Sequence, residues 1–173
     1  MGKIIFILGG ARSGKSSFAL ELAKKHKKVA FVATCRGLDK EMRQRIKKHQ
    51  QSRPKSWATF EQGRDITVAL GQIKNNFDCI VIDCLTLWVS NLLLGGNKEE
   101  KITQQVIKML TALKQGKSKV ILVSNEVGLG IVPANKLARQ FRDIAGRVNQ
   151  LVAKEADEVF FTVSGIPMKI KKG

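Results

Sequence analysis

Residues 3–16 read KIIFILGGARSGKS, and this stretch decides the fold of the 173-residue chain. Residues 3–8 are rich in β-branched side chains and almost wholly apolar, which is typical of a central parallel strand covered on both faces. Residues 9–16 satisfy the pattern G-x-x-x-x-G-K-[ST], and residues 16–26 continue with apolar side chains at helical spacing. The order of strand, glycine-rich turn and helix is the context that a phosphate-binding loop requires.

The chemistry of this loop follows from its residue types. The glycines at its two ends allow the backbone to turn its N–H groups toward one point, where they and the following helix N-terminus surround phosphate oxygens. Lys15 supplies a cation for the β- and γ-phosphates, and the Ser16 hydroxyl is placed to bind Mg²⁺. Every residue of the loop is therefore a predicted nucleotide contact: Gly9, Gly10, Ala11, Arg12, Ser13, Gly14, Lys15 and Ser16.

Strands and helices are predicted to alternate along the rest of the chain. Further strands are expected at residues 29–33, 79–82, 119–123 and 158–163. Further helices are expected at residues 39–51, 66–73, 85–94, 99–113 and 136–153. This alternation favours a single α/β domain over residues 1–173, of the P-loop NTPase (RecA-like) type, with a mostly parallel sheet and helices on both faces.

The composition excludes a disordered or fibrous chain and leaves the charge open to two interpretations. Hydrophobic residues make up 43% of the chain and charged residues 26%. Lys and Arg number 31 against 14 Asp and Glu, a net charge of +17. That excess indicates either a polyanionic partner or a lysine-rich surface that only solubilises the chain. A nucleic-acid-binding protein is the less favoured function, because Tyr is absent and Trp57 is the only aromatic residue between Phe31 and Phe60.

The sequence predicts a cytoplasmic protein without membrane insertion. Its longest apolar run, residues 4–8, is far shorter than the ~20 residues that cross a bilayer, and the first residues lack the pattern of a signal peptide. Cys35, Cys79 and Cys84 form no Cys-x-x-Cys pair, so a zinc site is not expected. The odd number of cysteines argues against a disulfide framework and fits a reducing compartment.

Acidic residues follow two of the predicted strands. A site of this type has a second acid at the end of a neighbouring strand that holds Mg²⁺ directly or through water, and Asp83 stands in that place. Asp83 has an alternative role as the N-cap of the helix at residues 85–94. Glu126, after the strand at residues 119–123, is a weaker candidate for activating an acceptor hydroxyl, or else a surface turn residue.

His49 lies in the most basic part of the chain. Residues 36–55 contain eight Lys and Arg against two acidic residues. Met42, Ile46 and His49 share a helix face by their spacing, which favours a buried structural histidine. The alternative is a nucleophile, because neutral imidazole attacks phosphorus well and neighbouring cations both hold it unprotonated and attract a triphosphate. Position alone does not choose between these roles.

Several long segments resemble one family. They are GGARSGKS, ATCRGLDKEMRQRIKKHQQSRPKSWATFE, DCLTLWVSNLL, SNEVGLGIVPANKLARQFRDIAGRVNQ and ADEVFFTVSGIPMKIK, which together span residues 4–171. They are similar to the bifunctional adenosylcobinamide kinase / adenosylcobinamide-phosphate guanylyltransferase family of cobalamin assembly. The phosphate loop alone indicates only a superfamily, whereas the segment around residues 124–150 is long enough to point to this family.

The resemblance implies two reactions on one scaffold. ATP or GTP phosphorylates the aminopropanol hydroxyl of adenosylcobinamide. GTP then transfers GMP through a guanylylated histidine to adenosylcobinamide phosphate, giving adenosylcobinamide-GDP and pyrophosphate. The family histidine falls on His49, with Lys15 as the second catalytic residue and Mg²⁺ on Ser16 and Asp83. A homo-oligomer, specifically a trimer, is also implied, in which a neighbouring subunit completes the helix that bears His49.

The resemblance also assigns the remaining nucleotide contacts. They are Thr34, Cys35, Arg36, Gln50, Gln51, Ser52, Arg53, Glu61 and Asp83. Local chemistry supports two of these assignments: Arg53 can pair with a phosphate through two N–H groups, and Glu61 can accept hydrogen bonds from guanine. A solvated charge at a strand end is the alternative for Glu61. Lys48 replaces a second histidine found in some members, which removes any support from a paired imidazole.

Overall fold

The computed structural model describes residues 2–37, 40–51, 53–73 and 76–173. The strands are β1 (Ile4–Gly9), β2 (Val29–Ala33), β3 (Ala58–Glu61), β4 (Cys79–Asp83), β5 (Lys119–Asn125), β6 (Glu158–Val163) and β7 (Ile166–Lys171). The helices are α1 (Lys15–Ala23), α2 (Lys40–Gln51), α3 (Ile66–Ile73), α4 (Leu85–Leu94), α5 (Glu99–Gln115) and α6 (Lys136–Glu155). Among the helices of these described residues, none is both long enough and apolar enough to cross a membrane.

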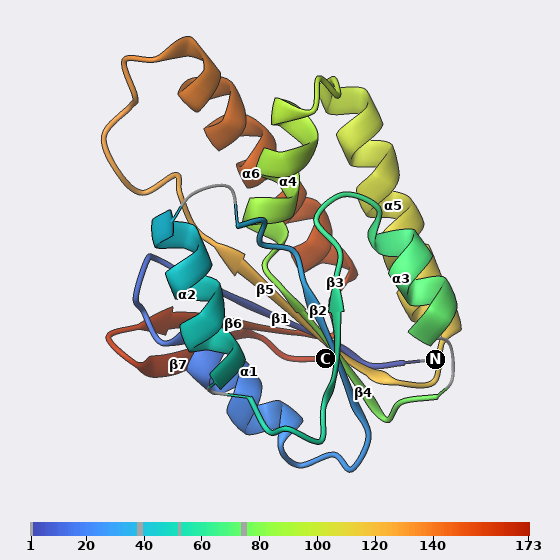
Figure 1. Ribbon diagram of the computed structural model, residues 1–173. Coiled ribbons are helices and arrows are strands. Elements are labelled where there is room, and N and C mark those ends of the chain that lie inside the picture. Colours follow the sequence, from blue (N-terminus) through green and yellow to red (C-terminus); the bar gives the residue numbers. More distant parts are fainter. Residues whose placement is uncertain (1, 38–39, 52, 74–75) are drawn as a thin grey trace.

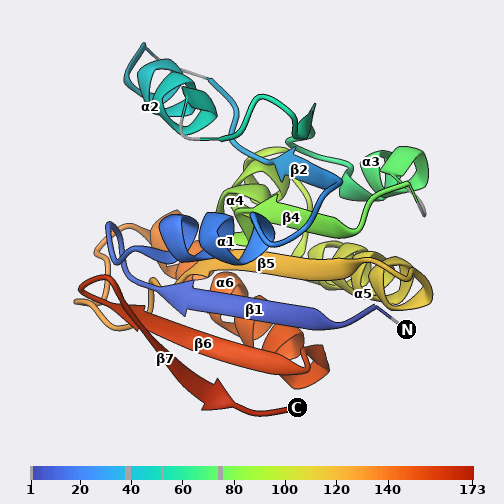
Figure 2. The same ribbon diagram turned by 90° about the horizontal axis from the view of Figure 1, so that it is seen from below.

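The strands form one seven-stranded sheet in the order β3-β2-β4-β5-β1-β6-β7. Strands β1 to β6 run parallel to one another, and β7 pairs antiparallel with β6. Figure 2 shows the strands nearly side by side, with β7 at one edge. The predicted α/β class with a mostly parallel sheet is therefore confirmed.

Two apolar layers cover the sheet, one on each face. On one face, side chains from α3, α4, α5 and α6 pack over β1, β4 and β5, with the fully buried Trp88 among them. On the other face, Ala19 and Ala23 of α1 pack with Phe31 and Trp57. Figure 1 shows this division, with α3 to α6 on one side of the sheet and α1 on the other. The near-continuous apolar strands follow from this burial on both faces.

Because the strands are parallel, the loops that follow them all lie at the same end of the sheet, beyond the carboxyl ends of the strands. Strand β5 lies between β4 and β1, and its Asn125 pairs with Gly9 while its Val123 pairs with Asp83. The prediction that Asp83 ends a strand neighbouring the phosphate loop is therefore wrong in detail, because β5 is inserted between the two strands. The phosphate loop and the segment after Asp83 still lie at the carboxyl ends of the strands, where ligands of parallel α/β sheets bind.

The structure confirms most predicted elements and adds two strands. The strands at residues 29–33 and 158–163 and the helices at 66–73 and 85–94 have the predicted bounds. Helix α1 ends at Ala23 rather than at residue 26. Strands β3 and β7 were not predicted, because β3 has only four residues with alternating exposure and β7 contains Pro167 and is exposed for nearly its whole length.

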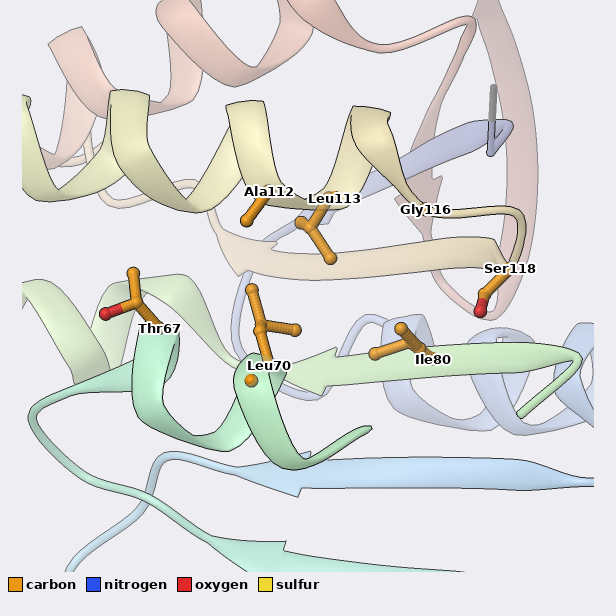
Figure 3. Close-up of a pocket in the computed structure, with 8 residues that line it drawn as sticks. Thr67, Leu70, Ile80, Ala112, Leu113, Gly116 and Ser118 are labelled. Carbon is orange, nitrogen blue, oxygen red and sulfur yellow. The ribbon is translucent and has the colours of Figure 1, made fainter. Parts of the chain in front are cut away.

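A small apolar cavity lies at the opposite end of the molecule from the phosphate loop. It has a volume of about 170 Å³ and lies between α3, α5 and β4 (Figure 3). Its lining residues are Thr67, Leu70, Gly71, Ile80, Ala112, Leu113, Gly116 and Ser118. Ile80 is near the beginning of β4, whereas Asp83 ends this strand. A nucleotide needs a larger site, of roughly 300 Å³ or more, so this cavity is not the nucleotide site.

Gly71 gives a test of this description of α3. It lies inside the helix, and a Cβ atom added there would meet no atom within 4 Å. We expect Gly71→Ala to raise the free energy of unfolding by about 1 kcal/mol, because alanine loses less backbone entropy in a helix than glycine does. Urea unfolding followed by circular dichroism measures this change. A lower free energy of unfolding would show that the space beside Gly71 is filled.

Candidate nucleotide-binding site

The phosphate loop approaches β6 and the turn after it so closely that two positions require glycine. A Cβ atom at Gly9 would lie 2.4 Å from the Thr162 Oγ1 atom and 2.5 Å from the Ser13 Oγ atom. Gly14 has a φ of 95°, and a Cβ atom there would lie 2.9 Å from the Gly165 Cα atom. Side chains at these two positions would push the loop away from the sheet and spoil the backbone arrangement that phosphate needs.

Hydrogen bonds to the β6–β7 hairpin hold the loop in place. The Ser13 and Thr162 hydroxyl oxygens lie 2.9 Å apart, and the Thr162 hydroxyl donates to the Leu8 carbonyl at 3.0 Å. The Gly165 N–H donates to the Ser13 carbonyl at 2.9 Å. Sequence analysis missed Thr162 and Gly165, because nothing in residues 158–171 indicates which residues face the loop.

Lys15 is held across the mouth of the loop. Only 7% of this residue is exposed, and its Nζ atom donates to the Gly10 carbonyl at 2.6 Å. Burial lowers the pKa of the Lys15 ammonium below its ordinary value, while the nearby Asp83 acts in the opposite direction. A buried cation with one carbonyl partner is suited to bind an anion that enters the loop.

Asp83 ends β4 on the same side, between two cations. It is close enough to Lys15 and Arg53 to raise the pKa of each against the effect of burial. The N-cap of α4 is Cys84, and it makes no side-chain capping hydrogen bond, so the alternative role of Asp83 as N-cap is wrong. Ser16 lies in the first turn of α1 and is half-buried. Hydroxyl and carboxylate oxygens are the donors that Mg²⁺ prefers, so these residues fit that ion.

Glu126 lies next to the loop but is used in a turn. Its backbone N–H donates to the Gly9 carbonyl at 3.0 Å, and its carboxylate accepts the Gly128 N–H at 2.7 Å. These hydrogen bonds agree with a turn residue, and the role of Glu126 in activating an acceptor hydroxyl stays a prediction.

Thr34 joins the end of β2 to the end of β4. Its hydroxyl donates to the Cys84 carbonyl at 2.7 Å and accepts the Cys84 N–H at 2.8 Å, and Thr34 itself is fully buried. Cys35 is half-buried and Arg36 is exposed. The predicted contacts after β2 therefore begin with a structural threonine whose side chain faces the protein, followed by two residues with accessible side chains.

Helix α2 lies at a corner of the molecule, away from the sheet (Figure 2). His49 belongs to this helix, and its backbone position is all that the structure describes of it. Gln50 and Gln51 are exposed, and the Gln50 amide donates to the Glu61 carboxylate at 2.9 Å. Ser52 lies outside the described residues. This hydrogen bond between Gln50 and Glu61 therefore joins the predicted contacts on α2 to the predicted contact on β3.

Arg53 lies flat against an aromatic ring. Its guanidinium carbon is 3.6 Å from the centre of the Phe31 ring, and Phe31 in turn stacks on Trp57. In the described part of the chain, the buried Nη1 atom of Arg53 makes no hydrogen bond. Burial lowers the pKa of the guanidinium, whereas Asp83 and Glu61 act to raise it. An arginine whose buried N–H group has no acceptor among the described residues is suited to pair with phosphate.

The fold and the loop define a P-loop NTPase-type protein, and solved structures agree on the fold. A KaiC-like protein from Pyrococcus horikoshii superimposes with a TM-score of 0.52 over 92% of this chain and 70% of its own, at 17% identity. An ATPase of a bacterial type III secretion system superimposes with a TM-score of 0.56 over 93% of this chain and 51% of its own, at 11% identity. These likenesses support a RecA-like fold.

Sequence comparison gives the family. Residues 5–170 match the family described as cobinamide kinase / cobinamide phosphate guanyltransferase (CobU). The bifunctional adenosylcobalamin biosynthesis proteins CobU of Escherichia coli and Salmonella typhimurium are 42% and 44% identical, each over 97% of this chain and 99% of their own. CobP of Pseudomonas aeruginosa, which bears the same description, is 40% identical over 95% of both chains. The chain therefore belongs to this family of bifunctional enzymes of cobalamin biosynthesis.

The cysteines give a test of the site's exposure. Burial raises the pKa of the Cys79 and Cys84 thiols to about 12, so both stay protonated in the folded protein at about pH 8. We expect iodoacetamide to modify the half-buried Cys35 first and bound nucleotide to slow that reaction. Mass spectrometry of peptides from the folded protein measures the order. Modification of Cys84 as fast as Cys35 would contradict the described packing of Thr34 on Cys84.

Proposed function

We propose that the chain works as one domain over residues 1–173 and carries both reactions of its family on adenosylcobinamide. In the first reaction, the aminopropanol hydroxyl oxygen of adenosylcobinamide attacks the γ-phosphorus of ATP or GTP. The bond from the γ-phosphorus to the bridging oxygen breaks, a nucleoside diphosphate leaves with the electron pair, and the hydroxyl proton passes to water. The buried Lys15 at the mouth of the glycine loop is the single observation that carries this part of the proposal.

Guanylyl transfer uses His49 as the nucleophile. A neutral imidazole nitrogen attacks the α-phosphorus of GTP, an N–P bond forms, and the bond to the α,β-bridging oxygen breaks, so that pyrophosphate leaves with the electron pair. A phosphate oxygen of adenosylcobinamide phosphate then attacks the same phosphorus and the N–P bond breaks. The product is adenosylcobinamide-GDP, and His49 is regenerated.

The surrounding residues support a nucleotide that spans from the loop to α2. Gly9 to Ser16 surround the phosphate tail, and Arg53 has an N–H group that no described residue accepts and that a phosphate oxygen can accept. Glu61, held by the Gln50 amide, is placed to accept hydrogen bonds from the guanine N1–H and amino groups. We assign the remaining contacts to residues that follow β2 and end β4, to the last residue of α2, and to one residue outside the described part of the chain: Thr34, Cys35, Arg36, Asp83, Gln51 and Ser52.

Magnesium belongs to the same proposal. Ser16 and Asp83 would hold the ion, directly or through water. The ion supplies neutralisation of charge on the phosphate oxygens. The side chain of Asp83 also offsets the positive charge of Lys15 and Arg53 at the mouth of the site.

The cellular location, the oligomeric state and the binding partners that we propose rest on the same family resemblance. We propose a cytoplasmic homotrimer that binds corrinoid substrates and nucleotides and uses no nucleic acid. The loop between β5 and α6 supports association between copies, because Leu129, Ile131 and Val132 expose 79%, 97% and 64% of their surfaces.

Lys15 tests the kinase assignment. We expect Lys15→Ala to lower phosphorylation of adenosylcobinamide by about a hundredfold or more, because the γ-phosphoryl group loses its cation. The exposed Lys25, which follows α1, provides a control, and Lys25→Ala should keep the wild-type rate. The assay follows transfer of label from γ-labelled ATP to the corrinoid. Normal turnover in Lys15→Ala would refute the assignment of the phosphate loop.

His49 tests the covalent mechanism. GTP labelled at its α-phosphate should leave on the wild-type protein a label that acid releases and alkali does not, as an N–P bond requires. His49→Asn should remain unlabelled, whereas His26→Asn, which changes the only other histidine, should label as the wild type does. Peptide mapping locates the label. A wild-type enzyme that makes the GDP-corrinoid without ever carrying label would rule this mechanism out.

A further inference from the structure

Helix α4 contains a buried polar residue that the reactions above do not use. Asn91 lies among the apolar residues of LTLWVSNLLL and is 8% exposed. Its side-chain nitrogen donates to two backbone carbonyls, Thr34 and Gly63, each at 2.9 Å. Because a buried amide must satisfy its donors, these two bonds fix where the two carbonyls lie.

The two carbonyls belong to segments that lead to predicted nucleotide contacts. Thr34 immediately follows β2 and lies two residues before Arg36, and Gly63 lies two residues after Glu61 at the end of β3. The chain leaves the sheet at Thr34, passes through α2 and returns in β3. Asn91 thus links helix α4, in the core of the protein, to both ends of the segment between β2 and β3. This segment contains α2 and His49.

Arg36 and Gly63 are themselves in close contact. A Cβ atom at Gly63 would lie 2.6 Å from the Arg36 Cγ atom and 2.8 Å from its Cδ atom, so the Arg36 side chain lies directly over this glycine. One turn earlier on α4, the Trp88 indole N–H donates to the Arg64 carbonyl at 2.7 Å, which holds the same segment. The position of Arg36 therefore depends on a backbone segment that α4 anchors.

We propose that Asn91 is a positioning residue for guanylyl transfer. By holding the Thr34 and Gly63 carbonyls at one amide, it sets the distance between Arg36 and Glu61 and so the place of the guanosine end of GTP relative to α2. This inference rests on the proposed function of α2 and Glu61. The phosphate loop is anchored separately, by Thr162 and Gly165, so the γ-phosphoryl transfer from ATP depends less on Asn91 than guanylyl transfer does.

The test compares the two half-reactions in the same variants. Asn91→Leu removes both donors at similar volume, whereas Gly63→Ala displaces the Arg36 side chain and leaves the Asn91 nitrogen at an ordinary contact distance of 3.4 Å from the new Cβ atom. Asn97→Leu is the matched control, because the Asn97 amide also donates to a backbone carbonyl, that of Leu92 at 2.8 Å, at the end of the same helix. Self-labelling from α-labelled GTP and phosphorylation of adenosylcobinamide by ATP are measured for each, together with the thermal midpoint.

We expect Asn91→Leu and Gly63→Ala to slow self-labelling by about ten- to a hundredfold, because a small misplacement of a reacting group has effects of this size, while phosphorylation by ATP falls by a clearly smaller factor. Asn97→Leu should leave both rates unchanged. Equal losses of both activities, or wild-type self-labelling in Gly63→Ala, would overturn the proposal. If Asn91→Leu does not fold, Asn91→Ala takes its place, because it removes the same two donors without adding a larger apolar side chain. A wild-type protein that lacks either activity would instead refute the proposed function.

Discussion

The close approach of the phosphate loop to the β6–β7 hairpin is the constraint on which the site depends. Gly9 lies so near Thr162 that it has no room for a side chain, and Gly14 has the same relation to Gly165. This contact, together with the Ser13–Thr162 hydrogen bond, keeps the loop's backbone turned toward one point. Lys15 is then buried with a carbonyl as its partner and its pKa lowered, ready for an anionic ligand.

The site has two parts that different elements support. The hairpin supports the phosphate loop, whereas α4 supports the residues before and after α2 through Asn91 and Trp88. Asp83 lies between the two parts, at the end of a strand whose next residue, Cys84, is bound to Thr34. Separate support suits the two proposed reactions, because one acts at the γ-phosphorus of a nucleoside triphosphate and the other at the α-phosphorus of a second GTP molecule.

Local patterns in the sequence predicted the parts of the fold that depend on local physics. Apolar strands such as Val29–Ala33 can be predicted because burial on both faces restricts the residue types. The glycine pattern of the loop can be predicted because tight turns restrict them too. Strands β3 and β7 escaped prediction because their sheet-edge positions impose no such restriction. The insertion of β5 between β1 and β4 is a property of long-range pairing. Asn91 carried one signal, a polar residue inside an apolar helix, which marks a buried hydrogen-bonding role.

In the proposed guanylyl transfer, one GTP molecule has its phosphate tail in the glycine loop while its α-phosphorus faces His49. A crystal structure with Mg²⁺ and a GTP analogue whose α,β-bridging oxygen is a methylene group tests it most directly, because that analogue cannot transfer GMP. We expect an imidazole nitrogen of His49 about 3–3.5 Å from the α-phosphorus, in line with the bridging carbon. A triphosphate seated in the loop with His49 turned away and another side chain in line would contradict it.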